Sequence, residues 1–197
     1  MDGRTAETIA EDLSRQIKER IQQENAREQE MDELQLALDI LKNRTLAFPE
    51  QAFKVITADQ EAALPYLRAA IDHAVREPDA LDPDEQLHFY ALFLLGQFQD
   101  KASFSGILDL ASLPLETLDV LIGDAVTEAL PDIMYNTFDG NIELLKQRIM
   151  DTEVDEFVRT GIASVLGQLY LDGRLPETEW KAIIRQVIHQ AREYEHV

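Results

Sequence analysis

Histidine and carboxylate side chains are the groups in this 197-residue chain that could bind a metal or act as acids and bases. The chain has four histidines and 38 acidic residues. A metal site or a general base needs at least two such groups at one place, and no two histidines stand at ligand spacing. Asp124 and Glu128, four residues apart, share one face of a predicted helix. Among 38 acids such pairs arise by chance, so their spacing alone predicts neither a raised pKa nor a hydrolytic site.

Sequence motifs that define enzyme classes are absent. We find no Gly-x-Ser-x-Gly elbow, no phosphate-binding glycine loop, no dinucleotide fingerprint and no calcium loop. The chain has no cysteine, which excludes disulfides, zinc thiolate sites and cysteine nucleophiles. We therefore expect a non-enzymatic protein with no catalytic residue, metal or cofactor. The alternative is an enzyme or a metal-dependent activity in a groove around His88, Tyr90, Asp124 and Arg159.

The charge of the chain says more about its partners than any single residue does. The formal net charge is −20, which opposes binding to nucleic-acid phosphates and to anionic membranes. Residues 77–145 hold fourteen acidic residues and one basic residue, Lys101. We expect this segment to bind a protein partner with a basic segment, or else to serve only solubility. The candidate contact residues are Tyr90, Asp124, Glu128 and Asp132.

The N-terminal region has a different composition from the rest. No apolar run of signal-peptide or membrane-span length occurs, so we expect a cytoplasmic protein with no membrane association. Residues 22–30 contain one small apolar side chain, so we interpret 1–30 as a polar helical extension and 31–197 as the main domain. Self-association through residues 5–41 is a further possibility, and the oligomeric state stays open.

The patterning of residues 31–197 predicts helices throughout. A helix is expected over 59–75, where Pro65 requires a late start or a bend. The acidic connection 77–85 is expected to lead into a helix capped by Asp82, with Pro83 at its first position.

A repeat is visible in the second half of the chain. Segments 87–97, 122–132 and 158–168 align, and their leucines Leu95, Leu130 and Leu166 are 35 and 36 residues apart. Second helices are expected over 104–111, 141–150 and 176–194, with turns at 139–140 and 172–173. This pattern predicts an all-α, right-handed solenoid of antiparallel helix pairs.

The third repeat resembles HEAT repeats most clearly. Asp155, Val158-Arg159, Ala163 and Leu166-Gly167 match that superfamily's signature. The resemblance implies that Asp155 and Arg159 form structural polar ladders between repeats, which His88 and Gly123 could not continue in the other two units.

At greater length, residues 31–190 resemble the bacterial domain-of-unknown-function family 1186. Segments 88–98, 122–130, 156–161 and 172–175 carry this similarity. It implies HEAT-like helix pairs but no activity. Some longer relatives have a cysteine-rich SEC-C metal-binding tail. This chain has no cysteine, so a zinc role for that tail does not carry over.

Overall fold

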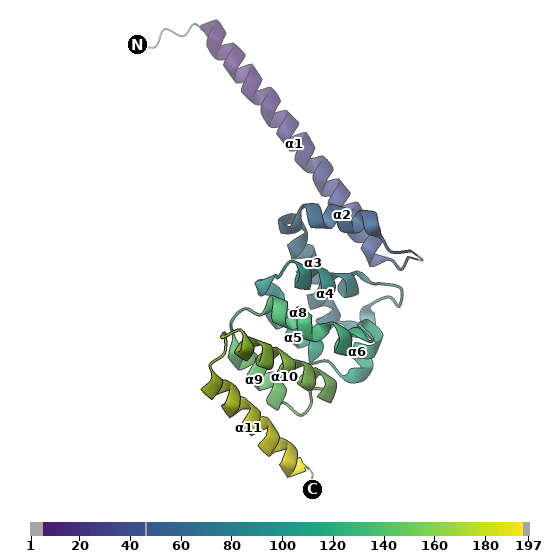
Figure 1. The fold of residues 1–197 in the computed structure, drawn as a ribbon. Helices are drawn as coiled ribbons and strands as arrows, with labels where there is room; N and C mark the ends of the chain where they lie inside the picture. The colour runs from purple at the N-terminus through teal and green to yellow at the C-terminus, as the bar shows by residue number, and fades with distance from the viewer. Residues whose placement is uncertain (1–5, 46, 195–197) are drawn as a thin grey trace. The chain divides into compact units, whose positions relative to one another are not determined.

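The computed structural model describes residues 6–45 and 47–194, which fold as helices and contain no β-strand (Figure 1). Within these ranges, the backbones of Asn43 and Glu85 pair as one isolated antiparallel β-bridge. The all-α prediction is therefore confirmed. The helices are α1 Ala6–Lys42, α2 Glu50–Ala58, α3 Gln60–Arg76, α4 Leu87–Gln97, α5 Phe104–Ala111, α6 Leu115–Leu121, α7 Ala125–Glu128, α8 Leu130–Thr137, α9 Ile142–Met150, α10 Glu156–Leu171 and α11 Glu177–Tyr194, with short 3₁₀ turns at Pro78–Ala80 and Lys101–Ser103.

The chain divides into two compact units, Met1–Leu41 with Thr45–Asp59 and Lys42–Arg44 with Gln60–Val197. In the first unit α1 runs without a break across position 30, and its residues 18–33 are exposed. Its last turns bury Leu34, Leu38 and Leu41. The side chains of Ile9, Leu13 and Ile17, which could serve self-association, lie outside the described residues.

The core of the second unit surrounds α4. This helix contacts α3 and α8, and α8 in turn contacts α10. Apolar residues occupy nearly all sides of α4, as is typical of a helix enclosed by its neighbours. The neighbouring helices come close at two glycines. A Cβ at Gly96 would lie 3.0 Å from Ile133 Cγ1, and one at Gly161 would lie 3.1 Å from Pro131 Cγ.

Most second-half helices agree with the predictions, with one clear exception. Helices α5, α9 and α11 begin and end within one residue of the predicted ranges. Segment 122–132 is not one helix, because the backbone leaves the helical conformation at Ile122 and again at Ala129. Residues 122–132 therefore contain α7 and the start of α8 instead of a continuous counterpart of α4.

The structure decides between the alternatives of one local prediction in the first half of the chain and corrects another. Helix α3 begins at Gln60 and includes Pro65, so the late start, one of the two alternatives, does not occur. Helix α4 begins at Leu87 rather than near Pro83, because the backbone of Asp84 and Gln86 pairs with that of Arg44 and Lys42. The Asp82 carboxylate does accept a hydrogen bond from the Asp84 amide at 2.9 Å, but this bond closes a turn before the helix.

An ion pair joins α3 to Asp100, three residues after the end of α4. Arg68 donates hydrogen bonds from Nε (2.7 Å) and Nη2 (2.5 Å) to the Asp100 carboxylate. The Asp100 side chain is 7% exposed and that of Arg68 is 37% exposed. Burial acts to raise the pKa of Asp100, but the hydrogen bonds and charge of Arg68 lower it on balance.

Candidate functional site

The turn between α6 and α7 positions Asp124, one of the predicted contact residues, in the second unit. Helix α6 ends where the Gly123 amide donates to the Leu118 carbonyl at 3.2 Å. Gly123 has a φ of 52°, in the left-handed region that glycine adopts most easily. The Asp124 carbonyl then accepts from the Glu128 amide at 3.0 Å and starts α7. The turn thus places Asp124 between two short helices.

A hollow of about 360 Å³ opens beside this turn. Its apolar walls include Leu115 and Phe157, which are 40% and 52% exposed, and Val126, which is buried. Phe157 comes from α10, which contacts α7. We call this hollow the acidic pocket, and its lining is Leu115, Glu116, Asp119, Gly123, Asp124, Val126, Thr127 and Phe157.

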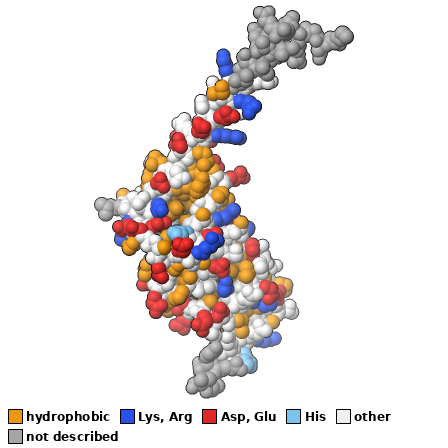
Figure 2. All heavy atoms as spheres, turned by 180° about the vertical axis from the view of Figure 1, so that it is seen from behind, with side chains coloured by type: hydrophobic (Ala, Val, Ile, Leu, Met, Phe, Trp, Pro, Cys, Tyr) orange, Lys and Arg blue, Asp and Glu red, His pale blue; other side chains and the backbone are white. Residues whose placement is uncertain are grey.

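The carboxylates of the acidic pocket have no cationic partner among the described residues. Glu116, Asp119 and Asp124 are all exposed, and the structure gives their side chains no hydrogen bond or ion pair there. Some acids elsewhere have a cationic partner, as Asp109 has in Arg148. Residues 102–145 contain no lysine or arginine. Figure 2 shows acidic side chains spread over one face of the molecule, with hydrophobic ones exposed between them.

The four predicted contact residues have different surroundings. Asp124 lines the acidic pocket. Glu128 on α7 and Asp132 on α8 are exposed and lie outside its lining. Tyr90 is half-buried on α4, and its ring makes an edge contact with Phe89 at 5.8 Å between centroids. The structure therefore brings one of the four into the pocket.

Sequence reasoning missed most of the pocket walls. Glu116 and Asp119 were counted among the fourteen acids, but nothing singled them out. Phe157 lies 33 residues beyond Asp124 in the chain, and its exposure is a tertiary property.

His88, a residue of the alternative enzyme hypothesis, is buried and lies outside the acidic pocket. Its side chain is 5% exposed, and Nε2 lies 3.0 Å from the carbonyl oxygen of Leu121, at the end of α6. Nδ1 is buried with no hydrogen-bond partner. Burial lowers the pKa of His88 more than the hydrogen bond raises it. The neutral ring thus connects α4 to α6, and the structure does not bring it together with Asp124.

Arg159 belongs both to that hypothesis and, with Asp155, to the polar ladder that the HEAT resemblance implies. Asp155 caps α10 by accepting a hydrogen bond from the Phe157 amide at 2.8 Å. The Arg159 Nε is buried without a partner, and no ladder between Asp155 and Arg159 of stacked repeats appears among the described interactions. Within the described ranges, no three histidine, aspartate or glutamate side chains are grouped so that they could hold a metal ion.

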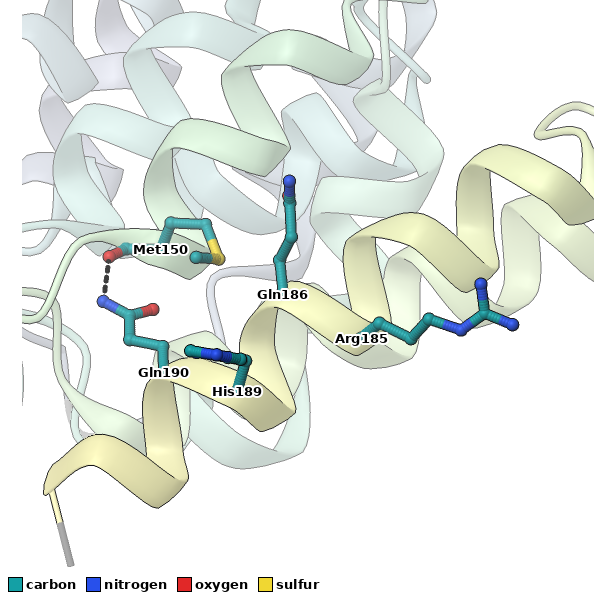
Figure 3. A pocket seen from close by; sticks show the side chains of 5 residues that line it. All are labelled: Met150, Arg185, Gln186, His189 and Gln190. Carbon is teal, nitrogen blue, oxygen red and sulfur yellow. Dashed lines mark hydrogen bonds between the residues drawn. The ribbon is translucent and has the colours of Figure 1, made fainter. Parts of the chain in front are cut away.

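A second hollow, of about 670 Å³, lies between α11 and the end of α9 (Figure 3). Gln190 Nε2 donates to the Met150 carbonyl at 2.9 Å. His189 and Gln186 also line it, but the guanidinium of Arg185 points away from the other four side chains. Its polar groups therefore do not converge on one point, and we assign it no chemistry.

The fold and the acidic pocket define an all-helical protein whose second unit exposes carboxylates beside apolar side chains. In the part of the chain that the structure describes, no helix is both long enough and apolar enough to cross a bilayer. The chain belongs to the family described as "Protein of unknown function (DUF1186)", whose model matches residues 31–190. This confirms the family resemblance seen in the sequence.

Two curated relatives are "Uncharacterized protein" sequences from Chlamydia muridarum and Chlamydia trachomatis serovar D. Each is 28% identical to this chain, over 61% and 60% of its length. The matches cover 49% and 47% of the relatives, so the chain aligns with about half of their length. No solved structure matches the chain.

Proposed function

We propose that this chain is a non-enzymatic protein-interaction module that binds a basic segment of a partner protein in the acidic pocket. One observation carries the proposal: exposed apolar walls at Leu115 and Phe157 stand beside three carboxylates that lack a cationic partner in the described chain. Exposed apolar groups edged by polar ones are typical of interaction sites.

Charge and apolar contact have different roles in this proposal. Each solvent-exposed ion pair contributes only about 0.2 to 1 kcal/mol, and salt screens it. The carboxylates therefore steer and orient a basic partner, while burial of Leu115 and Phe157 supplies more of the affinity. Glu128 and Asp132 extend the negative field outside the pocket and contribute to steering.

The finer architecture and location are part of the same proposal. We propose that α4, α8 and α10 are the first helices of successive HEAT-like pairs in a right-handed solenoid. The contacts of α4 with α8 and of α8 with α10 support this. The lack of cysteine suits a reducing compartment, and we place the protein in the cytoplasm.

The test is an affinity capture from an extract of the cells that express this chain naturally. Three tagged proteins serve as bait: the wild type, the pocket variant Asp119→Lys/Asp124→Lys, and the control variant Asp79→Lys/Glu153→Lys. The control changes the net charge equally at two exposed acids outside the described pockets. Each capture is made at low and at high salt, and retained proteins are identified by mass spectrometry.

We expect a protein that the wild type and the control variant retain at low salt and that the pocket variant loses. High salt should release it from the wild type and from the control variant. If the three baits retain the same proteins, the acidic pocket is not a binding site and the proposal is wrong.

A further inference from the structure

The shape of the acidic pocket limits what can occupy it. Its volume of about 360 Å³ is near the lower end of the range for ligand sites, roughly 300 to 1,000 Å³. Its walls include an aromatic ring, Phe157, and two aliphatic side chains, Leu115 and Val126. A hollow of this size and lining suits one long side chain of a partner better than a large cofactor.

The charge of the pocket requires that side chain to be cationic. Glu116, Asp119 and Asp124 have no cationic partner among the described residues, and the chain from 102 to 145 supplies none. An anionic group would be repelled, and an aliphatic one would leave the carboxylates without a partner. Lysine and arginine combine an apolar stem with a charged end, so either could lie along Leu115 and place its charge among the carboxylates.

Two features of the pocket favour arginine over lysine. First, the carboxylates of the pocket come from both α6 and the turn after it, so they surround a ligand from more than one side. A guanidinium presents five hydrogen-bond donors in a planar fork, so it can bind several carboxylate oxygens at once. The Phe157 ring is half exposed at the wall, where a guanidinium can stack on its face. A guanidinium is also less strongly hydrated than an ammonium, so it loses less on entering a partly apolar hollow.

We infer that the acidic pocket is an arginine-binding site, in which an arginine of the partner lies against Phe157 with its guanidinium among Glu116, Asp119 and Asp124. This inference rests on the proposed function and names the group that the pocket recognises. A lysine-rich partner would be attracted by the same field but would lack the stacking contact. The preference for arginine therefore depends on Phe157, and the attraction of cations depends on the carboxylates.

The test titrates the ¹⁵N-labelled full chain with three capped seven-residue peptides. They are identical except for a central arginine, lysine or citrulline, and citrulline keeps the shape of arginine without its charge. Amide shifts of Gly123, Thr127 and Phe157 report on the pocket. The same titrations are made with Phe157→Leu and with Asp119→Asn/Asp124→Asn.

We expect saturable shifts with the arginine peptide, at a dissociation constant on the order of 1 mM. The lysine peptide should bind about threefold more weakly, and citrulline at least tenfold more weakly. Phe157→Leu should remove the difference between arginine and lysine but keep binding of both. The Asp119→Asn/Asp124→Asn variant should lose about tenfold in affinity for both.

Equal affinity of the wild type for arginine and lysine, or no saturable shift with arginine, overturns the inference. The proposed function fails separately. If arginine shows no preference but the pocket variant still loses the captured partner, the interaction module stands and the arginine assignment is wrong. If the pocket variant retains the same proteins as the wild type, both are wrong.

Discussion

Removing one member of the ion pair between Arg68 and Asp100 should cost different amounts depending on which member is removed. Breaking a buried pair costs about 3 to 5 kcal/mol, because the remaining charge has no partner. Arg68→Gln leaves a carboxylate that is only 7% exposed, so we expect a loss near the lower bound, about 3 kcal/mol. Asp100→Asn leaves a guanidinium that is 37% exposed and can be hydrated, so we expect a loss of about 1.5 kcal/mol.

Urea unfolding followed by circular dichroism at pH 7 measures these differences in the free energy of unfolding. The pKa of Asp100 is lower in the folded state than in the unfolded state. The contribution of Asp100 to the free energy of unfolding is therefore complete above its unfolded-state pKa and is lost as the pH falls through its folded-state pKa. The double variant should lose less stability than the sum of the two single losses, and the difference, which is the coupling energy, should be at least about 1 kcal/mol. If Asp100→Asn costs more than Arg68→Gln, or if the losses add, the exposure argument is wrong.

Three further predictions concern single positions. His88 has a lowered pKa, so the folded state binds fewer protons than the unfolded state below about pH 6.5. As the pH decreases below about 6.5, the free energy of unfolding of the wild type should therefore decrease by up to about 1.4 kcal/mol per pH unit. His88→Gln, which keeps a donor for the end of α6, should remove that part of the slope in urea titrations at pH 5 to 7, and an unchanged slope would contradict this. Gly96→Val should destabilise the protein by about 2 kcal/mol, since its Cβ would lie 3.0 Å from Ile133. In the control Gly167→Ala the new Cβ meets no atom within 4 Å, so this variant should be more stable by about 0.5 kcal/mol. Equal shifts of the melting temperature in the two variants would refute the packing argument. Asp155→Ala should cost about 1 kcal/mol by removing the cap of α10, and an unaltered melting temperature would show that the cap is dispensable.

The fold was predictable where helix signals are local. Helix α5 was predicted at its observed bounds, and α9 begins after Asn141, whose side chain accepts from the Leu144 amide as an N-cap. The start of α4 was not predictable from nearby residues. The Gln86 amide donates to the Lys42 carbonyl at 2.8 Å, and the Arg44 amide donates to Asp84. Pairing with a segment about 40 residues earlier keeps the chain extended there, and no local pattern reports such a contact.

The site was predictable in charge but not in shape. The excess of acids in 77–145 identified the acidic region, and Asp124 was singled out from it. Its apolar walls depend on the contact between α7 and α10, which brings Phe157 to the turn. The backbone breaks at Ile122 and Ala129 end the short helices α6 and α7 beside the pocket, whereas the repeat alignment predicted one continuous helix over 122–132.

The affinity of the captured partner for two matched variants tests the central proposal most directly. Asp119→Asn/Asp124→Asn removes two negative charges in the acidic pocket, and Glu128→Gln/Asp132→Asn removes two outside it. Titration calorimetry at fixed salt should show a loss of at least about tenfold for the pocket variant and under about threefold for the other. Equal losses from the two variants would show that the partner responds to the overall negative field, and would contradict a binding site at the acidic pocket.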